Sequence, residues 1–104
     1  MPFSNIDQRE KHFLKHGHKV GAANPVDYED LADTFIFGPK DVFTFDCERK
    51  NLDIVRLHFV DYRFAVGDLE QRIVRTFHPK EHHIVDYYGG PLAYLKYECT
   101  QTGL

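Results

Sequence analysis

The feature of this sequence that most constrains its fold is a change in hydrophobic period near residue 41. Up to residue 38, apolar side chains recur every three or four positions, which is the spacing of one face of an α-helix. From residue 41 onward, short runs rich in β-branched and aromatic residues show a period of two, which is typical of strands. Because the helical segments precede the strands rather than alternating with them, the pattern predicts an α+β fold.

Two helices are predicted in the first part of the chain. The first spans residues 5–16, with Ser4 in the position of an N-cap. The second has Asn24 as its N-cap and Pro25 at the first helical position, and it ends before Gly38. Each carries an apolar stripe, so we expect both helices to pack on one face of a sheet.

Six strands are predicted after the helices, separated by turn-prone segments that contain Gly, Pro, Asn or Asp. They span residues 42–45, 54–60, 62–66, 72–77, 84–88 and 92–99. Short turns favour an antiparallel meander, so the prediction is a twisted antiparallel sheet of four to six strands. The 104 residues are expected to form a single domain, with a helical part over about 4–38 and a sheet over about 41–100.

The net charge of −3 argues mildly against a nucleic-acid or lipid partner, but the charge is unevenly distributed. Residues 1–20 carry four basic and two acidic side chains, whereas residues 21–46 carry one and six. Distant charges are screened in physiological salt, over a Debye length of about 8 Å. A positive site on the first helix is therefore compatible with the negative total.

The cysteines and the hydropathy of the sequence indicate where in the cell the chain is expected. Cys47 and Cys99 show no spacing typical of a metal site, so we expect two reduced thiols packed as small hydrophobic groups. No segment approaches the roughly 18 to 20 apolar residues of a membrane helix, and residues 1–12 lack the apolar core of a signal peptide. These features predict a cytoplasmic chain with no membrane association.

Seven histidines among 104 residues are the most unusual part of the composition. Imidazole is the side chain that transfers protons or binds metal near neutral pH. On a helical wheel, His12 and His16 share one edge of the apolar stripe of the first helix. Both are therefore expected where that helix meets the sheet, a place where partial burial shifts a histidine pKa.

Three segments together resemble a known superfamily. Residues 15–21 read KHGHKVG, residues 28–35 carry a Tyr, a Leu-Ala pair and a Phe at helical spacing, and residues 73–79 read IVRTFHP. This order is similar to that of the superfamily of barnase, EndoU, colicin D and RelE-like ribonucleases (the BECR fold), which occurs as toxin domains of bacteria and phages. Lys19 and Val20 stand where similar members carry an acid and a Phe.

The resemblance implies a metal-independent endoribonuclease that cleaves RNA by attack of the 2′-hydroxyl on the adjacent phosphate, leaving a cyclic phosphate. It makes His16 the catalytic histidine, as general base or acid. Lys15 and Arg75 are expected to hold the phosphate, Thr76 to add a hydroxyl donor, and His78 to supply a second proton-transfer group.

Further expectations concern the substrate and the partners. His12 and Lys19 are expected to contact the substrate, and Tyr94 is expected on the last strand, where an aromatic ring can stack a base. No cofactor or metal is expected. The resemblance implies RNA as substrate, such as tRNA, and a cognate immunity or antitoxin protein. It also allows delivery into the cytoplasm of a target cell.

Two other function classes stay open from the sequence. His12 and His16 have the i, i+4 spacing of two ligands of one metal ion, and a histidine at 78, 82 or 83 could be the third. However, no Glu stands between the first pair to act as a base. The other alternative is a non-catalytic module of the same fold that binds protein or RNA, which the negative net charge favours.

Overall fold

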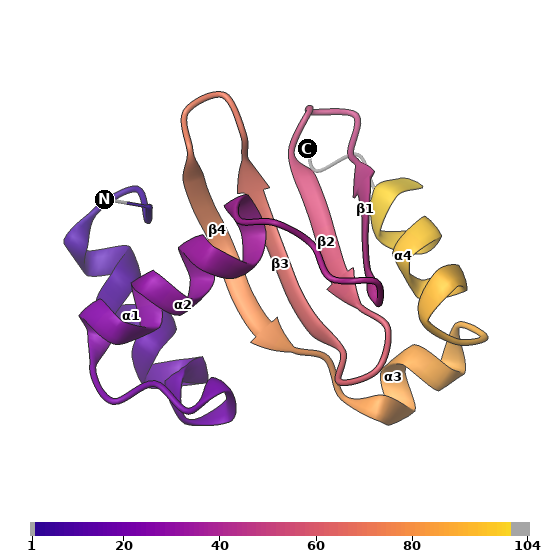
Figure 1. The fold of residues 1–104 in the computed structure, drawn as a ribbon, viewed down its shortest axis with the longest axis horizontal. Helices are drawn as coiled ribbons and strands as arrows, with labels where there is room; N and C mark the ends of the chain where they lie inside the picture. Colours follow the sequence, from indigo (N-terminus) through magenta and orange to yellow (C-terminus); the bar gives the residue numbers. More distant parts are fainter. Residues whose placement is uncertain (1, 101–104) are drawn as a thin grey trace.

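The computed structural model describes residues 2–100 and confirms the α+β class (Figure 1). The elements are α1 (Ile6–His16), the 3₁₀ helix η1 (Gly17–Val20), α2 (Pro25–Phe37), β1 (Thr44–Glu48), β2 (Ile54–His58), β3 (Arg63–Asp68), β4 (Ile73–Pro79), α3 (His82–Tyr87) and α4 (Pro91–Thr100). The sheet is an antiparallel meander with strand order β1-β2-β3-β4. N-terminal helices precede it, and C-terminal helices pack on it.

The start of α2 is as predicted, and the start of α1 is shifted by one residue. The Asn24 side chain accepts a hydrogen bond from the backbone N–H of Asp27 at 2.8 Å, as expected of an N-cap. For α1, the cap is Asn5, which accepts from the backbone N–H of Gln8 at 2.9 Å. The prediction of Ser4 as the cap is therefore wrong, because the helix begins at Ile6 and the residue before it has the extended cap conformation.

Helices cover both faces of the sheet. On one face, residues of α2 join Phe3 and residues of β3 and β4 in a core of Phe3, Tyr28, Ala32, Phe35, Ile36, Ala65, Val74 and Phe77. On the other face, residues of α3 and α4 pack on β2 and β3 in a core of Val55, Leu57, Phe64, Val66, Val85, Tyr94 and Leu95. The α1 helix contacts α2 and the edge strand β4.

A β-bulge interrupts the pairing of β3 and β4. Val66 pairs with Thr76, but Gly67 pairs with Val74, so Arg75 is an extra residue on the edge strand. The bulge breaks the alternation of side chains along β4. As a result Val74 and Phe77 both reach the core under α2, although an odd number of positions separates them.

The predictions of strands over 84–88 and 92–99 are wrong, because these segments form α3 and α4, and the sheet ends at Pro79. Gly89 and Gly90 both have positive φ, which ends α3, and Pro91 then stands at the first position of α4. The buried side chains of α4 include Tyr94, Leu95 and Glu98, which follow helical spacing. Aromatic content suggested a strand here, yet residues 92–99 contain no β-branched side chain.

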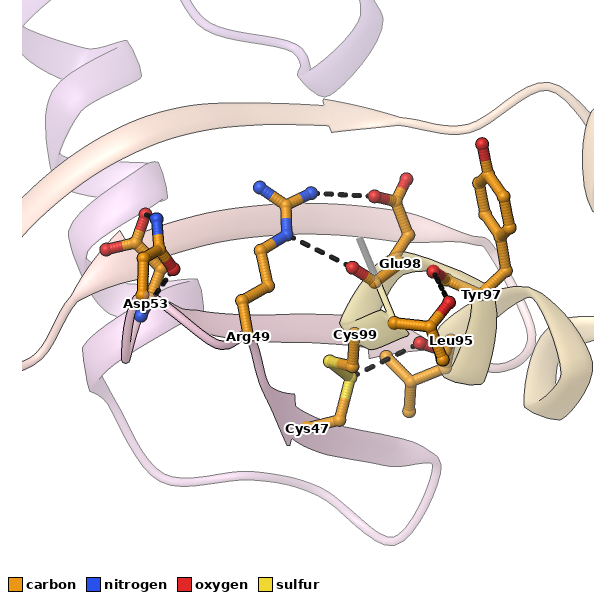
Figure 2. The surroundings of a disulfide bond; sticks show 9 residues. Cys47, Arg49, Asp53, Leu95, Tyr97, Glu98 and Cys99 are labelled. Carbon is orange, nitrogen blue, oxygen red and sulfur yellow. Dashed lines mark hydrogen bonds and ion pairs between the residues drawn. A yellow bond between two sulfur atoms is a disulfide. The ribbon is translucent and has the colours of Figure 1, made fainter. Parts of the chain in front are cut away.

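The prediction of two reduced thiols is also wrong, because Cys47 and Cys99 form a disulfide (Figure 2). Once residues 91–100 fold as a helix over β1 and β2, the end of α4 comes opposite β1, and the two Cα atoms lie 6.0 Å apart. Beside the disulfide, Arg49 donates to the Glu98 carboxylate at 2.7 Å. These contacts fasten the last turn of α4 to the first hairpin of the sheet.

The described residues contain no helix with the length and apolar character needed to cross a membrane.

Reduction of the disulfide is expected to lower the free energy of unfolding by about 2–4 kcal/mol, because the bond closes a loop between residues 52 positions apart. Urea unfolding with and without reductant measures this change. The double variant Cys47→Ser/Cys99→Ser should unfold at a lower urea concentration than the oxidised protein and should not respond to reductant. Equal unfolding midpoints for the oxidised and reduced wild type would contradict the prediction.

Candidate functional site

A pocket of about 330 Å³ lies at the end of β4, between the end of α1 and the start of α3. In Figure 1 the segment after α1 and the start of α3 lie on either side of the end of the edge strand β4. The lining is polar and rich in basic side chains: His12, Lys15, His16, Lys19, Thr76, His78, Pro79, Lys80, Glu81 and Ile84. Six of the predicted site residues are thus brought together from two distant parts of the sequence.

The transition from α1 to η1 places the first group of lining residues. At Gly17 the helix tightens into a 3₁₀ turn, so His16 closes α1 and Lys19 follows on η1. A Cβ on Gly17 would lie 2.5 Å from a ring carbon of Phe13, so a larger residue there would have to displace that ring. On the other side of the pocket, the Lys80 N–H donates to the Tyr62 carbonyl at 2.9 Å, which fixes the backbone beyond Pro79.

Two stacked imidazoles form the centre of the pocket. The rings of His16 and His78 have centroids 4.3 Å apart and planes within 15° of parallel. His12 also lies near His16, with a centroid distance of 6.0 Å. The Thr76 hydroxyl and Nδ1 of His78 are 3.2 Å apart, which is a hydrogen-bond distance. His16 is only 6% exposed, and its buried Nδ1 has no hydrogen-bond partner among the described residues.

Both stacked imidazoles are strongly biased toward the neutral form. Burial, followed by the charge of Lys80, lowers the pKa of His78 to about 3. Burial, followed by the charge of Lys19, lowers the pKa of His16 to about 4. The pKa of His12 is lowered by burial and by Lys15. At neutral pH the site therefore offers neutral imidazoles, each with one ring nitrogen that accepts a proton and one N–H that donates a hydrogen bond, and the tautomer decides which is which.

Lysine ammonium groups give the pocket its positive charge. Lys15 and Lys19 are exposed, and neither forms an ion pair within residues 2–100. Lys80 is more buried; its Nζ lies 4.4 Å from the centre of the Phe64 ring and 4.0 Å from a Glu98 oxygen. Burial lowers the pKa of Lys80, and Glu98 opposes that shift. An anion that entered the pocket would relieve the repulsion among these cations and favour protonation of the imidazoles.

Two predicted site residues lie elsewhere. Arg75, the bulge residue, donates to the Asp53 carboxylate at 2.7 Å and lies 3.7 Å from Asp68, and it does not line the pocket. Tyr94 is on α4 rather than on a strand; it is buried, and its hydroxyl donates to Glu98. Neither side chain is therefore placed to contact a ligand in the pocket.

The sequence pattern gave no role to four lining residues, Pro79, Lys80, Glu81 and Ile84. Residues 78–80 fall in the turn-prone segment between the strands predicted over 72–77 and 84–88, so the cation two positions after His78 was given no role. The signal was present in the sequence, because a lysine that directly follows a His-Pro pair stays within reach of the same strand end. Ile84 could not be assigned because residues 84–88 are predicted as a strand.

The geometry of the histidines argues against a shared metal ion. Within the described residues, no three side chains of the His, Cys, Asp or Glu type gather so that they could hold one. Stacked rings explain this result, because the nitrogen lone pairs of His16 and His78 lie in nearly parallel planes rather than converging on a point.

A second pocket, of about 370 Å³, lies by α2 and the start of β1, and it has a different character. Its charged lining consists of Asp30, Asp41 and Arg63, around apolar side chains such as Leu31 and Phe35. It contains no histidine and no lysine. Although it is larger, it lacks the proton-transfer groups of the first pocket.

The stability of the fold is expected to decrease as the pH falls from about 6.5 to about 4. The unfolded chain binds protons at its histidines in this range, whereas folded His16 and His78 stay neutral, so protons favour unfolding. Urea unfolding across this range should show a shallower pH dependence for His78→Gln than for wild type. The matched control is His18→Gln, at an exposed position outside the pocket, which should keep the wild-type dependence. Identical slopes for His78→Gln and wild type would contradict the assignment.

Comparison with known proteins assigns no family to this chain. No protein-family model matches it, and no curated protein matches it either. The chemistry of the site therefore has to be argued from its own residues.

Proposed function

We propose that the protein is a metal-independent endoribonuclease whose active site is the pocket of His16 and His78. The observation that carries the proposal is the stacking of these two neutral imidazoles in a pocket that Lys15, Lys19 and Lys80 also line. Phosphodiester transfer needs a base, an acid and positive charge on the phosphate, and the pocket holds groups of each kind.

The proposed reaction uses the two imidazoles as a proton donor and a proton acceptor. One neutral ring removes the proton of the ribose 2′-hydroxyl, whose oxygen attacks the adjacent phosphorus. The bond from phosphorus to the 5′-oxygen breaks, and the second ring, in its protonated form, gives that oxygen a proton. The products are a 2′,3′-cyclic phosphate and a 5′-hydroxyl, and the two rings have exchanged protonation states.

Binding of the phosphodiester allows one imidazole to be protonated, as the acid, while the other stays neutral, as the base. In the empty pocket, both imidazoles have lowered pKa values because of burial and the surrounding lysines. A phosphate anion beside them stabilises the imidazolium form, so substrate binding favours one protonated ring and one neutral ring. The Thr76 hydroxyl, when it accepts from Nδ1–H of His78, leaves Nε2 of that ring free to take a proton.

In this proposal the lysines take the role that the sequence pattern gives to Arg75. Lys15, Lys19 and Lys80 surround the place of the phosphate and stabilise the negative charge that builds on its oxygens. Arg75 is already neutralised by Asp53, a carboxylate that is 3% exposed, so its contribution is to the stability of the fold.

We propose RNA as the substrate, with tRNA or another structured RNA as the first candidate, and an immunity or antitoxin protein as the partner. A chain that cuts RNA would injure the cell that produces it, so an inhibitor is needed wherever the protein accumulates. A disulfide persists in oxidising surroundings, which supports a chain that leaves the producing cell. The cytoplasm of a target cell is the proposed place of action.

The central test is cleavage of total tRNA by the purified protein between pH 5 and 8, with and without EDTA. Cleavage that leaves cyclic phosphate ends and persists in EDTA is expected. His16→Ala should reduce the rate at least about a hundredfold, because a general acid or base is worth that much. His18→Ala, at the exposed histidine two positions away, is the matched control and should keep the activity. Intact RNA under all conditions would refute the proposal, and loss of cleavage in EDTA would favour the metal alternative.

A second test separates the roles of Lys80 and Arg75. Lys80→Met removes a charge from the pocket but keeps an apolar stem over Phe64, and it should reduce cleavage at least about tenfold. Arg75→Met should change cleavage only a fewfold and should lower the urea midpoint, because it leaves the buried Asp53 without its cation. The reverse pattern, with activity dependent on Arg75 and not on Lys80, would contradict this arrangement of the site.

A further inference from the structure

An exposed aromatic side chain stands next to the pocket on α3. Tyr87 is 83% exposed, the highest value among the large hydrophobic and aromatic residues that the structure describes. Ile84, which lines the pocket, precedes it by three positions, so both side chains lie on the same face of the helix. The rise between them along the helix axis is about 4.5 Å. An exposed ring therefore continues the surface of the pocket outward along α3.

Neighbouring tyrosines hold this ring in place. Tyr87 meets the ring of Tyr88 edge-to-face, with centroids 5.2 Å apart and planes at 86°. Tyr88 in turn stacks on Tyr97 of α4 at 4.2 Å and contacts the buried Tyr94 at 5.4 Å. Aromatic pairs of this kind are stabilising, so the orientation of Tyr87 is supported from behind while its own surface stays open to solvent.

The opposite side of the pocket carries a basic row. Lys11 and Lys15 are four positions apart on α1, and Lys19 follows on η1. All three are exposed, and none forms an ion pair with another described residue. A strand of negative charge that crossed the pocket would thus meet cations on the side of α1 and an aromatic ring on the side of α3.

We propose that Tyr87 is a stacking platform for a base of an unpaired RNA strand whose phosphate occupies the pocket. This inference rests on the proposed function and narrows its substrate to single-stranded segments, such as the loops of a folded RNA. Only an unpaired base exposes a face that a protein ring can cover, and stacking on an aromatic side chain accepts every base. A nucleotide has both features that this surface can bind: a negatively charged phosphate for the lysines and an aromatic base for the Tyr87 ring.

The experiment measures binding rather than cleavage, so that the two proposals can fail separately. The probe is a short fluorescent 2′-O-methyl oligoadenylate, which lacks the hydroxyl that attacks and stays intact on the wild-type protein. Fluorescence anisotropy should show that Tyr87→Ala weakens binding at least about fivefold, whereas Tyr87→Phe, which keeps the ring, binds like wild type. Inorganic tripolyphosphate, which has no base, should compete equally well for wild type and Tyr87→Ala.

The matched control is Phe45→Ala, which removes a ring of 46% exposure from β1, at the opposite edge of the sheet from the pocket (Figure 1). It should leave binding unchanged. Equal affinity of wild type and Tyr87→Ala would overturn the inference even if RNA is cleaved, and so would an equal loss in Tyr87→Phe or in Phe45→Ala. Binding that depends on the Tyr87 ring without any cleavage of tRNA would uphold the platform and refute the nuclease.

Discussion

The structure depends on the burial of the central strand β3 on both of its faces. Phe64 and Val66 point into the core beneath α4, and Ala65 points into the core beneath α2. An antiparallel sheet often exposes one face to water, but the side chains on both faces of this strand are apolar. A helical layer on each side is therefore required, and the chain supplies one before the sheet and one after it. The pocket forms where the edge strand of this sheet passes between the two layers.

The sequence predicted the N-terminal half of this arrangement and misjudged the C-terminal half. The Asn24 cap and the regular apolar spacing after it identify α2 because both signals are local. Residues 92–99 carry no comparable local signal, since their hydrophobic and aromatic side chains are compatible with either a strand or a helix. What decides between a strand and a helix there is the uncovered apolar face of β2 and β3, which is a tertiary requirement. The disulfide was not predicted for the same reason, because Cys99 comes opposite Cys47 when residues 91–100 form the helix α4.

The candidate site divides in a similar way. His16 was predicted from its position on the helix and from the resemblance, and Thr76 and His78 from the chemistry that the resemblance implies; all three line the pocket. Arg75 was assigned by the resemblance, and the structure makes it the extra residue of the bulge in β4. A one-residue irregularity in pairing leaves no mark in composition or period, so it could not be foreseen from one sequence. The more buried cation beside the histidines is Lys80, whereas Arg75 is paired with Asp53.

The separation of His16 and His78 along the chain affects when the pocket can exist. One belongs to the first helix and the other to the last strand, and α2 with three strands lies between them. During synthesis, α1 is made early, yet its histidine stays without its stacking partner until β4 has emerged and paired with β3. Any chemistry that needs both rings is thus absent from the nascent chain for most of its production. A chain that stops before β4 therefore lacks the stacked pair of imidazoles.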